Sequence, residues 1–225
     1  IDPQRIWVPD LTIDHTCFIL KDQIFIGLSV LCCSCLFLFA EELCRLIEQY
    51  GYVIAAKHKA GQPKISGPEP ETLKRLSGFC DLLLVEADGA RRLPLKVPAV
   101  HEPVIPEFAD IVVGVTGLDC IGKKICDIAH RPEDVAEFLR KKTDEPVMWE
   151  DVVKIASSEN GLRKNVGEKS FLVYFNKADV LESSGVAENI IKKCREAGIE
   201  AVCGSLKKIM ERQEICRKFH GIRRK

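Results

Sequence analysis

The feature that most constrains this chain is a series of short apolar runs, each closed by a polar turn. The runs cover residues 24–30, 52–56, 82–86, 111–115, 171–175 and 201–203. Their hydrophobicity is continuous rather than alternating, as strands covered on both faces of a parallel sheet require. Helical patterns separate several of them, over residues 41–50, 132–142 and 186–197. Because strands that alternate with helices indicate crossover units, the sequence predicts a three-layer α/β fold with a mostly parallel sheet.

A length of 225 residues suits one medium domain or at most two small ones, and we expect a single domain. We expect an irregular segment over residues 1–22 and a basic helix over residues 207–225, which hold eight basic and two acidic side chains. The connection over residues 88–110 carries four prolines. It is predicted to lie outside the core, as a functional loop or an exposed spacer.

Charge and cysteine content exclude several classes of protein. Lys plus Arg and Asp plus Glu both number 33, so the formal net charge is zero and nothing indicates DNA binding. The 11 cysteines include no pair of CxxC motifs and are predicted to be reduced cytosolic thiols.

One apolar segment is long enough to raise the question of a membrane. Residues 24–40 (IFIGLSVLCCSCLFLFA) are 17 residues without a charge, at the short limit for a membrane-spanning helix. A buried strand running into a helix explains the segment at least as well. A membrane-anchored form is the alternative.

Asn176, Lys177 and Asp179 directly follow the run 171–175 as the motif NKAD. Ligands of open parallel sheets bind beyond the carboxyl ends of the strands. NKAD is similar to the guanine-specificity element of GTP-binding proteins. A carboxylate there can accept from both the ring N–H and the exocyclic amine of guanine, while the Asn amide meets the other edge and the Lys stem covers a face. A solvated turn after a strand is the alternative.

Glu86, Asp88 and Gly89 close the run 82–86 as the motif EADG. Acids at the tip of a buried strand can hold Mg²⁺ or position water beside a phosphate-binding turn. Glu86 and Asp88 are therefore candidate catalytic residues, and Asp88 is also a candidate metal ligand. Gly89 would let a ligand approach the backbone closely. An ordinary strand exit with acids facing water explains the motif equally well.

An intact phosphate cradle is missing from the sequence. A Walker A motif needs GxxxxGK[ST], but residues 30–35 read VLCCSC, without glycine, lysine or threonine. The sequence therefore leaves open whether the chain is an enzyme. Arg91 and Arg92 could meet phosphate or form a solvated basic pair. His101 and His130 each lie close to a proline, where surface or capping roles are favoured over catalysis.

These pieces, in this order, resemble the YqeC family of selenium cofactor biosynthesis or selenium-dependent hydroxylase accessory proteins. The matching stretches are LLLVEADGARRLPLKVPAVHEPVIPEFADIVVGVTGLDCIGKKI, AHRPE, KIASSENGLRKNV, FLVYFNKADVL and CGSLK, between about Gly78 and Lys207. The resemblance implies a P-loop NTPase-like fold and a role in maturing selenium-containing molybdenum hydroxylases in the bacterial cytoplasm. Family members carry a GGKT-type loop where this chain reads LCCSC. The difference reflects either a true loss of the phosphate-binding loop or a lesion in the gene.

The resemblance supports a nucleotide-gated maturation role. Its implied cofactors are Mg²⁺ and a purine nucleoside triphosphate, with GTP favoured. Its implied partner is a selenium or molybdenum enzyme under maturation. Ser205, in the turn after the last apolar run, joins Gly89 and the NKAD residues as a candidate nucleotide contact. The alternative is a catalytically inactive scaffold of the same fold, its phosphate site lost, that binds a maturation partner.

Overall fold

The computed structural model describes residues 18–19, 44–49, 57–58 and 65–209. The predicted strands at 24–30 and 52–56, the apolar segment 24–40 and the VLCCSC stretch lie outside the described residues, as does most of the predicted C-terminal helix. Residues 206–209 are helical, which agrees with the start of that helix. No helix in the described part of the chain has the length and apolar character needed to cross a bilayer.

Within the described residues, the main sheet has four strands in the order β1 (Phe18–Ile19), β5 (Ile111–Gly117), β7 (Ser170–Asn176) and β8 (Glu200–Cys203). β5, β7 and β8 are parallel, and β1 pairs antiparallel with the outer edge of β5. The strands predicted at 111–115, 171–175 and 201–203 are therefore confirmed, and the fold is α/β with a mostly parallel sheet, compatible with three layers.

The burial of β5 explains why its sequence could be recognised. Every residue from Val112 to Gly117 is buried, so both faces of the strand are covered. A strand in that position takes apolar side chains on both faces, which gives a continuous run in place of an alternating one. The register aligns Gly117 with Asn176, so β5 and β7 end at the same level.

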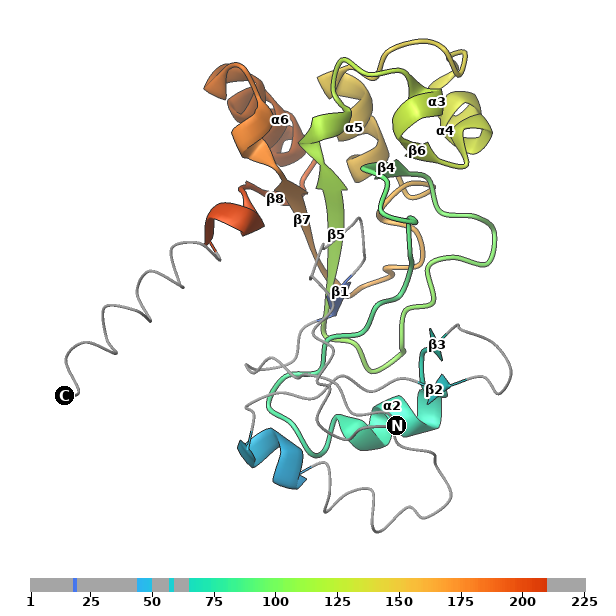
Figure 1. Cartoon of the computed structure of the whole chain (residues 1–225), viewed down its shortest axis with the longest axis vertical. Coiled ribbons are helices and arrows are strands. Elements are labelled where there is room, and N and C mark those ends of the chain that lie inside the picture. The colour runs from blue at the N-terminus through green and yellow to red at the C-terminus, as the bar shows by residue number, and fades with distance from the viewer. Residues whose placement is uncertain (1–17, 20–43, 50–56, 59–64, 210–225) are drawn as a thin grey trace, which may run out of the picture.

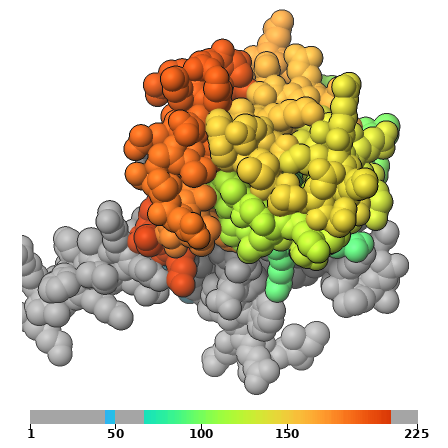
Figure 2. All heavy atoms as spheres, turned by 90° about the horizontal axis from the view of Figure 1, so that it is seen from above, coloured from blue at the N-terminus to red at the C-terminus, as the bar shows by residue number. Residues whose placement is uncertain are grey.

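Five helices have defined bounds in the described chain: α2 (Pro70–Leu76), α3 (Ile125–Ile128), α4 (Pro132–Leu139), α5 (Trp149–Ser157) and α6 (Ser184–Glu196). Residues 44–49 are also helical, within the helix predicted over 41–50. Figure 1 shows α3 to α6 gathered around the carboxyl ends of β5 and β7, with α2 near the opposite end. Seen from that carboxyl end, residues coloured from yellow-green to orange form one continuous surface (Figure 2).

Two predicted helices are confirmed with shifted ends. α4 begins at Pro132 as predicted but ends at Leu139, because Arg140 takes a left-handed backbone with φ 60°. α6 begins at Ser184, where the Ser183 hydroxyl accepts a hydrogen bond from the Gly185 N–H at 3.2 Å. It ends before Gly198, whose φ of 71° suits glycine at a helix terminus.

The predicted strand at 82–86 is wrong. Residues 82–90 form no strand. In the described chain β5 is flanked by β7 and β1, which leaves residues 82–86 without a ladder partner. Leu83 packs instead against Leu76 of α2, as do Leu73 and, from the helix at 44–49, Leu46. The apolar run is thus half-buried and packs against helices in place of a sheet. Its hydrophobicity alone could not distinguish the two outcomes.

The prediction that residues 88–110 lie outside the core is also wrong. Leu95 and Val97 belong to the largest cluster of buried residues in the described chain. β4 (Leu95–Lys96) pairs in parallel with β6 (Ala129–His130), which fixes the middle of the connection against a distant part of the chain. The rest of the connection remains irregular, as expected.

Hydrogen bonds tie this connection to its surroundings in several further places. The Val104 N–H donates to the Ala87 carbonyl at 3.0 Å. From the segment after α5, the Lys164 ammonium donates to the Ala99 carbonyl and the Asn165 amide to the Pro103 carbonyl at 3.0 Å. The peptide bond before Pro103 is cis. An irregular segment can satisfy its backbone groups in this way without regular secondary structure.

Two further pairs of elements complete the described fold. β2 (Lys57–His58) and β3 (Ile65–Ser66) form an antiparallel pair. Two short 3₁₀ helices, η1 (Leu118–Cys120) and η2 (Ala178–Val180), follow β5 and β7 directly and contact each other. They bring together the turns after two neighbouring strands.

Candidate functional site

The turns after β7 and β8 are joined by the side chain of Asn176. This residue is buried, 7% exposed, and its Oδ1 accepts from the Lys177 N–H at 2.8 Å and the Leu206 N–H at 3.1 Å. The backbones add two bonds, from the Ala178 N–H to the Gly204 carbonyl and from the Gly204 N–H to the Phe175 carbonyl, both at 2.9 Å. The NKAD turn and the turn after β8 therefore form one rigid unit.

Lys177 links this unit to the turn after β5. Its backbone is left-handed, with φ 62°. Its ammonium lies 2.9 Å from Asp119 Oδ2. The other carboxylate oxygen of Asp119 is buried and has no hydrogen-bond partner among the described residues. Three strand exits thus meet at one edge of the sheet.

Asp179 is the exposed carboxylate of the cluster. A hydrogen bond from Ser205 is the main reason that the pKa of Asp179 lies below its usual value. The side chain is therefore ionised at neutral pH and oriented by a neighbour, while its surface remains open to solvent. The structure brings Asn176, Lys177, Asp179 and Ser205 together, as the sequence predicted.

A second cluster lies around the buried Lys96, which is 5% exposed. Its ammonium contacts three acceptors: the Asp88 carboxylate, the Gly89 carbonyl at 2.9 Å and Glu102 Oε2 at 2.8 Å. Since an ammonium has three N–H groups, Lys96 is fully satisfied. Arg131 donates two further bonds to Glu102, at 2.7 and 2.8 Å. We call Asp88, Lys96, Glu102 and Arg131 the ion-pair network.

Glu102 is the centre of this network. Besides Lys96 and Arg131, the Ala99 N–H donates to its Oε2 at 3.0 Å. The bonds from Arg131, supported by those from Lys96 and Ala99, hold the pKa of Glu102 far below its usual value. Glu102 is therefore ionised at neutral pH.

The pKa values of Glu86 and Asp88 are shifted in the opposite direction from that of Glu102. Desolvation raises the pKa of Glu86, and the charge of Asp88 raises it further. Desolvation also raises the pKa of Asp88, against the hydrogen bond and charge of Lys96. Gly89 adjoins them, but a Cβ there would meet Glu86 Oε1 at 3.5 Å, which is ordinary contact. Glycine is therefore not required at that position by the described chain.

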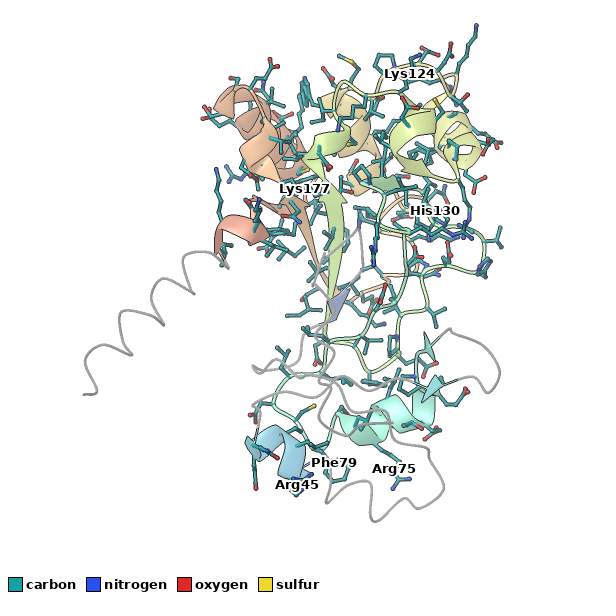
Figure 3. The ribbon with its side chains drawn as sticks, in the orientation of Figure 1. Arg45, Arg75, Phe79, Lys124, His130 and Lys177 are labelled. Carbon is teal, nitrogen blue, oxygen red and sulfur yellow. The ribbon has the colours of Figure 1, made fainter. Side chains whose placement is uncertain are left out.

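The structure does not join the two clusters. No hydrogen bond or ion pair connects described residues of the NKAD unit with those of the ion-pair network. In Figure 3, Lys177 and His130, the residue of β6 that is paired with Lys96, lie on opposite sides of β5. His101 is 78% exposed, which agrees with a surface position.

Lys96, Glu102 and Arg131 were missed by sequence reasoning. Lys96 stands among apolar residues in the segment LPLKV, where a lysine cannot remain buried without acidic partners. Asp88 of EADG and Glu102 of HEP lie within eight residues of it and were the available signal.

The residues around Asp88 fit Mg²⁺ only as a pair of carboxylates that shares the ion with phosphates and water. In the described chain, no three His, Cys, Asp or Glu side chains are grouped to hold a metal ion. Mg²⁺ in nucleotide sites is commonly held by one or two carboxylates together with phosphates and water. Glu86 and Asp88 supply such a pair, and their mutual repulsion is the kind that a cation relieves.

Comparison with known proteins assigns the chain to a protein family. A family model described as YqeC protein matches residues 21–133, about half of the sequence. The chain belongs to the YqeC family. The match starts before the stretches on which the resemblance rests and ends before NKAD. A curated relative, the uncharacterized protein YqeC of Escherichia coli (strain K12), is 32% identical over 165 residues, covering 72% of this chain. The match spans 64% of that relative's length. No solved structure matches.

Proposed function

We propose that this YqeC-family chain is a nucleotide-binding accessory protein with a P-loop NTPase-like fold, and that GTP is its preferred nucleotide. The observation that carries the proposal is the convergence of Asn176, Lys177, Asp179 and Ser205 at the carboxyl edge of the sheet. Sites at this edge are the usual ligand sites of open α/β sheets.

The geometry suggests a role for each group. The Asp179 carboxylate, ionised and open to solvent, accepts the ring N–H and exocyclic amine of guanine. Asn176 holds the two turns through its oxygen, so its amide NH₂ is the group left to meet the base. Lys177 is held by Asp119, which fixes its stem beside the turn so that it can cover a face of the base.

Glu86 and Asp88 are the proposed Mg²⁺ ligands. A bound Mg²⁺ would neutralise charge on the nucleotide phosphates. The chain's own contribution is to keep two carboxylates close together in a partly desolvated place, with Lys96 fixing Asp88. Gly89 places its carbonyl on Lys96 and so shapes the turn.

The proposed biological role is selenium cofactor biosynthesis or the maturation of selenium-dependent molybdenum hydroxylases in the bacterial cytoplasm. Its support is the family and the resemblance of the EADG and NKAD motifs to nucleotide-gated accessory proteins. The partner would be a selenium or molybdenum enzyme. DNA is not proposed as a ligand.

Calorimetric titration with GTP and ATP, each with Mg²⁺, tests the base site. We expect GTP to bind the wild-type chain and the Asp179→Ala variant to lose roughly tenfold or more in affinity, because charge-assisted hydrogen bonds are lost. Asp179→Asn should bind XTP better than GTP, since an amide can donate to the carbonyl that replaces the amine. Asp144→Ala, which removes an exposed carboxylate elsewhere, is the matched control and should change nothing.

The second candidate is a scaffold of the same fold that binds a maturation partner without nucleotide. The observation that favours it is the VLCCSC sequence at the position of the phosphate loop. If the folded wild-type chain binds neither nucleotide at millimolar concentration, the nucleotide proposal fails and the scaffold becomes the better account.

A further inference from the structure

Three basic side chains are carried by the segments that also form the ion-pair network. Arg91 and Arg92 are exposed, and His130 is half-buried. No hydrogen bond or ion pair joins any of the three to another described residue. The parallel register of β4 and β6 sets His130 directly opposite Lys96. The loop that carries the arginines folds back on itself, because Lys96 binds both Asp88 and the Gly89 carbonyl at its start.

Two of the nearby acids, Glu102 and Asp88, are already bound by basic groups of the network. Glu102 accepts from Lys96, Arg131 and the Ala99 N–H. Asp88 is bound by Lys96. The network therefore fixes its own charges internally, and the Arg91 and Arg92 guanidiniums keep their N–H donors available.

Backbone strain marks the same place. Arg91, Arg92 and Arg131 have φ of 51°, 65° and 56°, in the left-handed region that non-glycine residues rarely adopt. Such conformations persist where the surroundings over-determine them and are concentrated at ligand sites. Here the over-determining contacts are those of the ion-pair network, two residues of which, Asp88 and Lys96, bracket Arg91 and Arg92 in sequence.

We propose that Arg91, Arg92 and His130 form a binding site for a tetrahedral oxyanion of the phosphate type. A guanidinium presents paired N–H donors that match two oxygens of such a group. A neutral imidazole adds one N–H donor. The site is independent of the NKAD unit and uses none of its residues, so it can exist whether or not the chain binds a nucleotide base.

The surrounding charges suit an anion. Burial and then the charges of Arg131, Lys96 and Arg91 lower the pKa of His130, and Glu102 opposes them. A bound dianion would favour the imidazolium and raise that pKa. Binding should therefore take up a proton, and affinity should rise as the pH falls.

Titration of the full chain with sodium sulfate and with inorganic phosphate tests the site. Sulfate stays dianionic between pH 5.5 and 8, so its pH dependence reports protein groups alone. Arg91→Ala should weaken binding of both anions by roughly tenfold. Arg195→Ala removes an exposed arginine on α6 and should bind like the wild type. Circular dichroism of each variant checks that it is folded.

The pH arm uses His130→Gln, which retains a hydrogen-bond donor but does not titrate. Wild-type affinity for sulfate should increase from pH 8 to pH 5.5, and the variant should show a flatter profile. Glu86 and Asp88, whose pKa values are raised, are present in both proteins. Their contribution to the pH dependence of sulfate affinity therefore cancels when the two profiles are compared.

Two results would overturn the proposal: no wild-type binding of either anion at tens of millimolar, or equal loss in Arg91→Ala and Arg195→Ala. A GTP titration of Arg91→Ala identifies the source of the oxyanion. Weaker GTP binding as well as weaker phosphate binding supports the site as the holder of a nucleotide's terminal phosphate. Weaker phosphate binding alone supports a separate phosphate-bearing substrate.

Discussion

Replacing Glu102 with glutamine should destabilise the chain in a pH-dependent way. The wild-type carboxylate accepts bonds from Arg131 at 2.7 and 2.8 Å and lies 2.8 Å from the Lys96 ammonium. Glutamine keeps the shape but removes the charge, so Lys96 and Arg131 lose a counter-charge. Breaking a buried ion pair from one side costs about 3–5 kcal/mol. Because the Arg131 side chain is 31% exposed and can regain water, we expect about 2 kcal/mol at pH 7.

The sign of the pH effect follows from the lowered pKa of Glu102. A carboxyl whose pKa is lower in the folded state stabilises it above the unfolded pKa, and this stability is lost as the pH falls toward the folded value. The wild type should therefore lose stability below about pH 4.5 through this group, while Glu102→Gln has no such group to lose. The difference between the two proteins should shrink by about 1 kcal/mol from pH 7 to pH 3, after allowance for solvent screening.

Urea unfolding followed by circular dichroism at pH 7, 5, 4 and 3 measures this difference. Glu107→Gln, which neutralises an exposed acid of the same connection, is the control and should lie within about 0.5 kcal/mol of the wild type at every pH. A cost of Glu102→Gln that is the same at pH 3 as at pH 7 would refute the assignment of the stability to the ionised carboxylate.

Two further predictions concern packing and thiol exposure. Gly161→Ala should lower the unfolding free energy by at least about 2 kcal/mol, because the added Cβ would stand 2.0 Å from the Ile155 carbonyl oxygen. The control is Gly185→Ala, whose Cβ meets only the Ser183 hydroxyl at 3.4 Å. We expect this variant to be tolerated in the same urea titration. Iodoacetamide labelling followed by mass spectrometry should modify the exposed Cys126 in the native chain but not Cys120, since burial raises the pKa of that thiol to about 12; equal labelling of the two would contradict the packing around η1.

Sequence reasoning succeeded where a pattern is local and repeated. The strands at 111–115 and 171–175 were predictable because both faces are covered and their composition is uniformly apolar. The end of α6 was predictable from Gly198. The meeting of NKAD with Ser205 followed from the rule that parallel strands end at one edge, which the register of β7 and β8 bears out.

The failures have a common physical cause. The run at 82–86 is as apolar as a strand, but whether it joins a sheet depends on a partner elsewhere in the chain. β4 and β6 are two residues long and 34 positions apart, too short for any periodic pattern. The helix α5 was overlooked, although Asp151 in its first turn and the spacing of Val152 and Ile155 were available signals.

The fastening of the connection 88–110 has a consequence for how the molecule opens. Its links reach Ala87, Lys164, Asn165 and the strand β6, so it cannot detach at one point while the others hold. Segments joined in this way exchange their amide hydrogens together, as one cooperative unit with a shared opening free energy. An irregular stretch of chain would then show the slow, uniform exchange normally seen in helices and sheets, and its rate would report the integrity of the ion-pair network.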